Sequence, residues 1–396
     1  MGEVTRLVRS YYRYQAVANC VFFSPVFFVY YETRAGLDVA TILWLQSYAV
    51  AVRALLDLPF GAVADRWSRR RCLQASAAGY ALGALGLVLS PRLETAVLAE
   101  TLFASAAALK SGADSAFLFD ALDSAGRLDR YPATEGRGQA VSSLASGATA
   151  VAGGVLAAWH VALPYVATFV AAVAGVVLAA RLGGEETRRR LRASPAVLVA
   201  AAARAARAPA VAWAIAVAAT AVTASHVYFY FQQPWLADLG VPVALFGVAF
   251  AATKLVTALV AAVAHRVDGA LGMRGTAGVM AAVPAVGLAA MSVAAGPAAA
   301  VLVLSRGGLD GLWQPLVNVW MNRLVASDRR ATMLSLQSLV ARLVLAAALA
   351  LLGGVTAAVG LRATLATAAG ALVLAGATLA AAAPRVTARA CRAEAV

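Results

Sequence analysis

Two basic–acidic pairs stand inside apolar stretches of this chain, and the members of each pair are four residues apart. Lys110 precedes Asp114 in one stretch, and Arg306 precedes Asp310 in the other. Because residues i and i+4 lie on one face of a helix, each pair can form an ion pair. Two interpretations follow. The charges neutralise each other and hold helices together, or the carboxylate of Asp114 or Asp310 titrates when its partner changes.

Two further cations in apolar stretches, Lys254 and Arg342, have no acidic residue three or four positions away. An unpaired buried charge is expensive, so each cation needs a partner on another helix or an anionic ligand. Asp310 could serve one of them across helices. The sequence leaves open whether these cations form interhelical salt bridges or bind an anionic substrate group.

Aromatic and amide side chains gather in the same stretches, and ligand pockets combine apolar walls with a few placed polar groups. His226 can relay a proton, although a single histidine among aromatic residues more often packs with a hydrogen bond. The candidate cavity residues are Asn19, Phe23, His226, Tyr230, Lys254, Trp313, Gln314, Asn318 and Arg342.

The elements that must position these residues are long apolar runs. Of 396 residues, 62% are hydrophobic and 13% are charged, whereas soluble domains have about 45–50% and about 25%. This composition excludes a soluble enzyme and a disordered chain. A bilayer core needs about 20 apolar residues per helix. The runs predict twelve spans, at about 14–33, 41–62, 72–90, 94–122, 138–158, 161–181, 209–232, 242–264, 275–294, 298–321, 332–353 and 361–383.

We therefore expect an all-α integral membrane protein. Most of the 33 Lys and Arg residues fall on one side of the alternating spans, which places both termini in the cytoplasm. The net charge of +14 is then explained by membrane orientation and lipid contact, not by nucleic-acid binding. The first span follows the N-terminus directly, so we expect no cleavable signal peptide. The three cysteines show no metal-binding spacing, and we expect no metal, no cofactor and no catalytic residue.

Polar residues near the ends of spans have a simpler explanation. We expect Glu100 and Asp120 to be solvated. Gln232, Gln233 and Trp235 lie near the end of the seventh span, where such side chains anchor a helix at the membrane interface.

The chain divides into two similar halves, 1–182 and 209–396, joined by a basic cytoplasmic linker at 183–208. The pair at 110 and 114 corresponds to the pair at 306 and 310, and Arg53 falls near the counterpart of Lys254. Parallel six-span repeats are typical of secondary transporters. Ionisable residues lie within spans 1, 2, 4, 7, 8, 10 and 11, whereas the interiors of spans 3, 6, 9 and 12 carry none.

The turn after the second span carries the most specific motif, which runs from Gly61 through Asp65 and Arg66 to Arg69 and Arg70. It resembles the signature loop of the major facilitator superfamily, G-x-x-x-D-R-x-G-R-[RK], with a serine where the family prefers its second glycine. The first glycine lets the backbone approach a neighbouring helix. The resemblance implies that this loop latches the two halves together in the outward-open state. The alternative is that its arginines only hold the loop in the cytoplasm.

Just before this loop, Arg53 and Asp57 repeat the i,i+4 spacing, and Asp57 stands near Pro59 at the cytoplasmic end of its span. We expect Asp57 to belong to the gate more than to the substrate site. In the family, every third helix faces lipid and the others surround a central cavity. That plan agrees with the placement of the ionisable residues.

The resemblance implies a secondary active transporter that moves a small molecule by alternating access and is coupled to protons. Its expected partners are the substrate, protons and membrane lipids, and we expect a monomer in the cytoplasmic (inner) membrane. Drug/proton antiporters of the family carry Gly-Pro-x-x-Gly-Gly in span 5, but only Gly153 and Gly154 are present here. Import and export therefore both remain open. The alternative is a facilitator-fold protein without transport that acts as a sensor or partner subunit.

Overall fold

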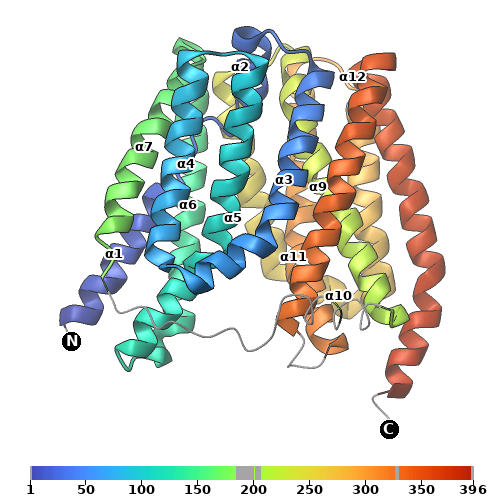
Figure 1. Cartoon of the computed structure of the whole chain (residues 1–396). Coiled ribbons are helices and arrows are strands. Elements are labelled where there is room, and N and C mark those ends of the chain that lie inside the picture. Colours follow the sequence, from blue (N-terminus) through green and yellow to red (C-terminus); the bar gives the residue numbers. More distant parts are fainter. Residues whose placement is uncertain (1, 184–199, 201–206, 326–329, 394–396) are drawn as a thin grey trace. The chain divides into compact units, whose positions relative to one another are not determined.

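The computed structural model describes residues 2–183, 200, 207–325 and 330–393 (Figure 1). The linker at 183–208 lies almost wholly outside these residues. All regular elements within the described ranges are helical. They are α1 (Gly2–Ala18), α2 (Phe27–Ala35), α3 (Val39–Arg66), α4 (Arg69–Leu89), α5 (Leu93–Ser124), the 3₁₀ helix η1 (Leu128–Arg130), α6 (Tyr131–Trp159), α7 (Leu163–Ala180), α9 (Pro209–Asp238), α10 (Ala244–Val293), the 3₁₀ helix η2 (Pro297–Leu304), α11 (Ser305–Leu324) and α12 (Arg330–Ala393).

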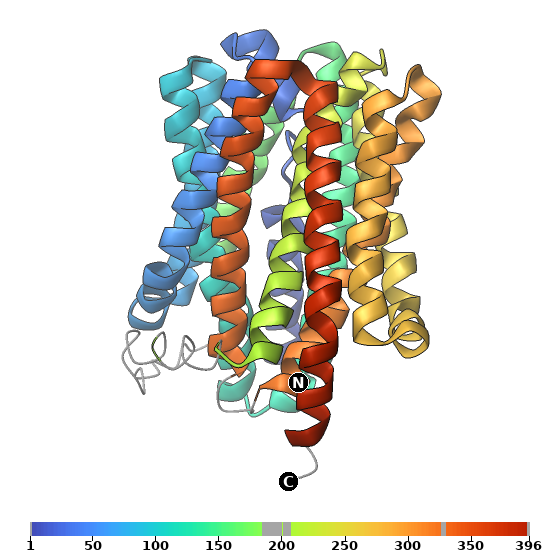
Figure 2. The same ribbon diagram turned by 90° about the vertical axis from the view of Figure 1, so that its right-hand side faces the viewer.

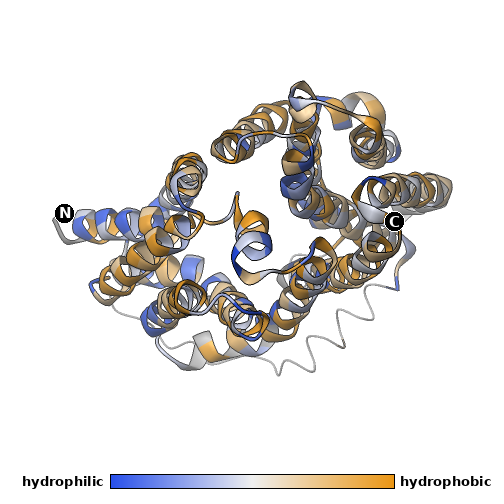
Figure 3. Cartoon of the chain, turned by 90° about the horizontal axis from the view of Figure 1, so that it is seen from above, coloured by the Kyte–Doolittle hydropathy of each residue, from blue (hydrophilic) through white to orange (hydrophobic). Residues whose placement is uncertain are grey.

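Many of these helices have the length and composition of membrane spans. Seven helical segments of the described chain are long and apolar enough to cross a bilayer. Seen from above, hydrophobic residues run along most helices (Figure 3). Two of the seven are double: α10 contains Gly272 at φ 63° and α12 contains Gly360 at φ 79°, where the backbone is not helical. Figure 2 shows α12 folding back on itself at the top of the view. The all-α membrane fold is confirmed, and the number twelve stays a prediction.

The chain forms two compact units. Unit 1 contains Met1–Asp38, Tyr48–Arg192 and Pro242–Ala251, and unit 2 contains Val39–Ser47, Ala193–Val241 and Ala252–Val396. The core of unit 1 includes Tyr11, Tyr14 and Phe117, which are all almost fully buried. In unit 2, most of the apolar side chains of α9 are buried. Both α3 and α10 are divided, so that the first turns of each belong to one unit and the rest to the other.

The first predicted span is not a continuous helix. It is helical in α1 and α2, but residues 19–26 form turns. Pro25 explains part of this break, because proline lacks an N–H and disfavours helix in the residue before it. The Phe22 N–H is instead satisfied by Thr168 Oγ1 at 3.0 Å. The prediction of an unbroken helix at 14–33 is therefore wrong in its middle.

Glycines permit close helix contacts within unit 1. A Cβ at Gly153 would lie 2.0 Å from the carbonyl oxygen of Phe22, in the broken segment of the first span. A Cβ at Gly154 would lie 2.6 Å from the oxygen of Ala244, and one at Gly247 would lie 2.0 Å from the oxygen of Ala150. The double glycine of α6 therefore lets two other backbone segments pack directly against this helix.

Candidate functional site

The loop after α3 is described in part. The side chains of Asp65 and Arg66 lie outside the described part of the structure. A Cβ at Gly61 would meet no described atom within 4 Å, and the gating role of this glycine stays a prediction. Ser68 caps α4, and its Oγ accepts a hydrogen bond from the Arg71 N–H at 3.2 Å. Its φ of −78° requires no glycine, which explains why serine fits where the family prefers glycine.

The arginines that follow bind residues at the ends of neighbouring helices in unit 1. Arg69 is buried, forms an ion pair with Asp120 and donates to the carbonyl oxygen of Ala116. Arg70 donates to the oxygen of Leu182 at 3.3 Å. The side chain of Asp120 is only 3% exposed. The expectation that Asp120 is solvated is therefore wrong, because Arg69 covers it.

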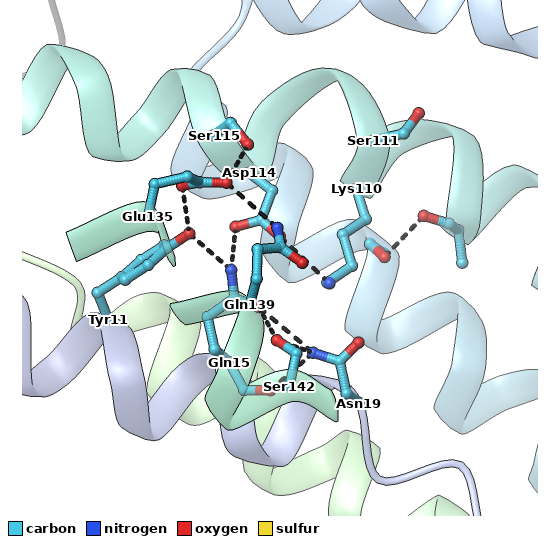
Figure 4. A network of polar contacts seen from close by, with 12 residues as sticks. Tyr11, Gln15, Asn19, Lys110, Ser111, Asp114, Ser115, Glu135, Gln139 and Ser142 are labelled. Carbon is cyan, nitrogen blue, oxygen red and sulfur yellow. Dashed lines mark hydrogen bonds and ion pairs between the residues drawn. The ribbon is translucent and has the colours of Figure 1, made fainter. Parts of the chain in front are cut away.

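The predicted pair Lys110 and Asp114 lies in a larger polar network of unit 1 (Figure 4). Lys110 Nζ is 3.2 Å from Asp114 Oδ2. The amide nitrogen of Gln15 donates to Asp114 Oδ1 and to the Tyr11 hydroxyl, both at 2.7 Å. The Tyr11 hydroxyl in turn donates to Glu135 Oε2 at 3.2 Å. A chain of hydrogen bonds thus joins two carboxylates on different helices, α5 and α6.

Other members complete this network. Asn19 Nδ2 donates to the main-chain oxygen of Gln15 at 2.7 Å and to Ser142 Oγ at 3.0 Å. Ser142 Oγ donates to Gln15 Oε1 at 3.2 Å. The amide of Gln15 therefore uses both of its N–H groups and its oxygen, although only 1% of the residue is exposed. We call the whole set the Asp114 network. It comprises Tyr11, Gln15, Asn19, Lys110, Asp114, Ser115, Glu135, Gln139 and Ser142.

Glu135 is the charged residue of this network that the site prediction missed. Its carboxylate accepts from Ser115 Oγ at 2.8 Å and from Gln139 Nε2 at 3.2 Å, in addition to Tyr11. These three donors are neutral. The sequence held a signal, because a glutamate at the start of an apolar run is a buried-charge candidate. Tyr11 lies before the first predicted span and Gln15 lies at its start, and neither residue is charged, so they gave no comparable signal.

A small cavity lies beside this network. Lys110, Cys20, Tyr14 and Tyr80 line it together with apolar residues, and its volume is about 20 Å³. A space of this size holds one water molecule. It is too small for a substrate.

The structure also places the second predicted pair, in unit 2. Arg306 Nε lies 3.4 Å from Asp310 Oδ2 and donates to Ser225 Oγ at 3.4 Å. The guanidinium carbon lies 5.0 Å from the centre of the Phe229 ring. Trp313 Nε1 donates to Asp310 Oδ1 at 3.2 Å.

Lys254 belongs to the same group, because it interacts electrostatically with both Arg306 and Asp310. Glycines bring its helix close to α11. A Cβ at Gly307 would lie 2.6 Å from the oxygen of Thr253, and one at Gly311 would lie 2.7 Å from the oxygen of Thr257. The name Arg306 cluster denotes Ser225, Phe229, Lys254, Arg306, Asp310 and Trp313.

Several other cavity candidates lie near this cluster on the same helices. Gln314 and Asn318 are exposed and follow Asp310 at steps of four residues on α11, so the three share one face. His226 Nδ1 is 2.8 Å from the oxygen of Val222, one turn back. Tyr230 is buried, and its ring centre is 6.4 Å from that of His226.

The remaining site candidates have less specific surroundings. Phe23 stacks on Phe103 and Tyr165, with ring centres 5.1 and 4.6 Å apart. Arg53 and Asp57 are half-buried on α3, and Arg342 is half-buried on α12. Their functional roles stay predictions.

Two further sequence predictions are wrong. Glu100 is buried and accepts a hydrogen bond from the Tyr31 hydroxyl at 2.8 Å, because α2 covers this turn of α5. Gln232, Gln233 and Trp235 are buried rather than placed at an interface. Trp235 Nε1 donates to the oxygen of Met291 at 2.8 Å. This end of α9 therefore packs inside unit 2.

Within the described ranges, no group of three His, Cys, Asp or Glu residues could hold a metal ion.

Comparison with known proteins places this arrangement in context. A model of the Major Facilitator Superfamily matches residues 16–350. A mutant of the nucleoside transporter NupG has a TM-score of 0.82 at 13% identity, over 95% of this chain and 100% of that one. A mutant of the peptide transporter POT has a TM-score of 0.72 at 14% identity, over 96% and 93%. A bacterial homologue of the human lysosomal transporter Spinster has a TM-score of 0.74 at 15% identity, over 98% of both chains. No curated protein matches.

Proposed function

The chain belongs to the Major Facilitator Superfamily, and on this premise we propose that it is a proton-coupled secondary transporter of a small molecule, working by alternating access. The fold is that of structures of nucleoside and peptide transporters. What supports the proton coupling is one observation in the Asp114 network. That network contains two carboxylates, Asp114 and Glu135, and one cation, Lys110, which pairs with Asp114.

The charges of the network explain why a proton would bind. Lys110 compensates Asp114, whereas the recorded hydrogen bonds of Glu135 come from neutral donors. Glu135 is half-buried, and burial disfavours the charged form of a carboxylate. If Lys110 moved away from Asp114, that carboxylate would also be left with a neutral donor, Gln15.

The two carboxylates are also coupled to each other. Gln15 and Tyr11 connect them through hydrogen bonds, so a proton that binds at one changes the donors available to the other. Asn19 and Ser142 fix the Gln15 amide at the other end. Because Asn19 opens the turns at residues 19–26, a change in the network reaches the interrupted part of the first span.

We further propose that the protein is a monomer in the cytoplasmic (inner) membrane, with both termini in the cytoplasm. The distribution of arginines along the chain supports this orientation. The halves 1–182 and 209–396 would then be the two repeats that rock during transport.

Transport in proteoliposomes tests the proposal. The purified protein is reconstituted with a pH-sensitive dye inside, and uptake is measured for a panel of nucleosides, short peptides and organic acids. We expect an imposed pH gradient to drive accumulation of at least one compound. Asp114→Asn and Glu135→Gln should each abolish that accumulation while exchange without a gradient continues.

The control is Asp129→Asn, which removes a carboxylate that is 67% exposed in the same unit. It should leave the coupling unchanged. Gradient-driven accumulation in both carboxamide variants would contradict the assignment to this network. Absence of exchange for every compound in the panel would favour a sensor or partner subunit instead.

A further inference from the structure

We propose that the basic end of α7 in unit 1 binds one anionic phospholipid, with the phosphate of its headgroup on arginines and an acyl chain along an exposed row of valines. This inference goes beyond the proposed transport function, because the ligand is a lipid of the membrane and not the substrate. The arginines concerned, which we call the basic collar, are Arg9, Arg13, Arg71 and Arg181.

The exposed face of α7 supplies the apolar half of the site. The opposite face is built from small residues such as Ala172 and Gly175, and a Cβ at Gly175 would lie 3.4 Å from the side chain of Ala77 on α4. Side chains three or four residues apart share one helix face. The exposed row follows this spacing, with 38–60% of each residue exposed, and consists of Val166, Val170, Val173 and Val177.

Arg181 continues the valine row at its end. It follows Val177 by four residues and is exposed, so it lies on the same face. From Val166 to Arg181 the helix rises by about 22 Å, at 1.5 Å per residue, which is more than half of a bilayer core of about 30 Å. A basic group at the end of an apolar row matches the order of headgroup and acyl chain in a phospholipid. A soluble anion would contact the arginine and leave the valines exposed.

Helix packing brings the start of α4 to the same end of unit 1. Leu182, next to Arg181, shares a buried core with Leu7 of α1, and Figure 1 shows the end of α7 beside α1. The side chain of Arg70 donates to the carbonyl oxygen of Leu182 at 3.3 Å. Arg71, the next residue, is exposed. The first turn of α4 therefore presents its arginine near the end of α7.

The exposed face of α1 adds the other two arginines. Leu7, Tyr11 and Tyr14 are buried in the core that contains Leu182, whereas Arg9 and Arg13, four residues apart, are exposed on another face. A helix with one apolar face and one arginine-rich face is typical of the membrane interface, where it attracts anionic lipids. The core of unit 1 thus holds arginines from three elements at one end.

The depth of the basic collar matches that of lipid phosphates. Each of its arginines lies within five residues of the end of a predicted span, a rise of about 7.5 Å or less. The headgroup layer on each side of a bilayer core is about 5–7 Å thick. Trp67, just before α4, is 48% exposed, as is typical of aromatic side chains at the interface. Arginine forms paired hydrogen bonds with phosphate.

The test is lipid binding to the purified full chain, measured by native mass spectrometry in detergent. The probes are phosphatidylglycerol, which is anionic, and zwitterionic phosphatidylcholine with the same acyl chains. We expect phosphatidylglycerol to bind about tenfold more tightly or better. Because each basic residue near a membrane surface contributes a factor of about five, Arg181→Gln should raise its Kd about fivefold. The double variant Arg71→Gln with Arg181→Gln should raise it about twentyfold.

Arg92→Gln is the matched control, because it also removes an exposed arginine of unit 1 but lies beyond the other end of α4. It should leave the Kd unchanged. All three substituted side chains are exposed, so the variants without added lipid should melt at the temperature of the wild type.

A second probe separates a lipid from a soluble anion. Glycerol 3-phosphate carries the phosphate without acyl chains, and it should not displace phosphatidylglycerol even at about a thousandfold excess, since burial of a few methylene groups is worth that factor. Displacement at equal concentration would overturn the lipid assignment in favour of a soluble anion. Equal binding of the two phospholipids would overturn the proposal, as would collar variants that bind phosphatidylglycerol as tightly as the wild type does.

Discussion

Gly247 offers a prediction whose size follows from the geometry. At this residue the first turns of α10 meet α6 within unit 1. A Cβ would lie 2.0 Å from the carbonyl oxygen of Ala150 and 2.9 Å from the Cα of Val151. Ordinary contact begins at 3.4 Å, so Gly247→Ala requires a separation of up to about 1.4 Å, the difference between 3.4 and 2.0 Å. The atoms that the new Cβ would meet belong to the backbone of α6, so they cannot move aside by a side-chain rotation.

Overpacking of this kind costs about 1–3 kcal/mol, and a backbone obstacle favours the upper end. Alanine in place of glycine returns up to about 1 kcal/mol through helix propensity. We therefore expect Gly247→Ala to lower the free energy of unfolding by about 1–2 kcal/mol. Because overpacking and helix propensity have opposite effects on stability, a control that measures the helix-propensity effect alone is needed.

Gly278→Ala, in the helical segment of α10 after the break at Gly272, is that control, because a Cβ there meets no described atom within 4 Å. It should stabilise the protein by up to about 1 kcal/mol. The assay is reversible unfolding of both variants in mixed micelles, with thermal melting in detergent as a second readout. Equal stability of the two variants would refute the close contact between α10 and α6.

Two other substitutions test separate contacts. Arg69→Gln should destabilise unit 1 by about 3–5 kcal/mol, because it leaves Asp120 buried without its cation. An additional Asp120→Asn change should recover part of this loss in the same unfolding assay. A double variant whose loss equals the sum of the two single losses would show that the pair is not coupled. Tyr31→Phe should cost about 1.5–3 kcal/mol, because it removes the hydrogen bond to the buried carboxylate of Glu100; a change below about 0.5 kcal/mol would mean that water replaces the hydroxyl.

Much of the fold follows from the sequence, because apolar runs of about 20 residues have few alternatives to membrane helices. The interruption at residues 19–26 could not be predicted from hydropathy, because hydropathy carries no information on backbone geometry. Pro25 was the available signal. The close packing of α10 on α6 depends on Gly154 and Gly247, and no local pattern encodes it.

The site was predictable where the chemistry is local. Lys110 with Asp114 and Arg306 with Asp310 share helix faces, and the structure pairs both. Contacts between distant helices were not predictable. The burial of Asp120 depends on an arginine 51 positions earlier in the chain, and Glu135 meets Tyr11 across 124 positions. Single-sequence spacing cannot encode such separations.

The central claim is that substrate and proton move together through this protein. The most direct test is the number of protons that enter per substrate molecule, measured in proteoliposomes in which the membrane potential is clamped at zero. The account predicts a fixed stoichiometry of at least about one in the wild type and a smaller one in Glu135→Gln. Substrate entry without any proton movement in the wild type would contradict it.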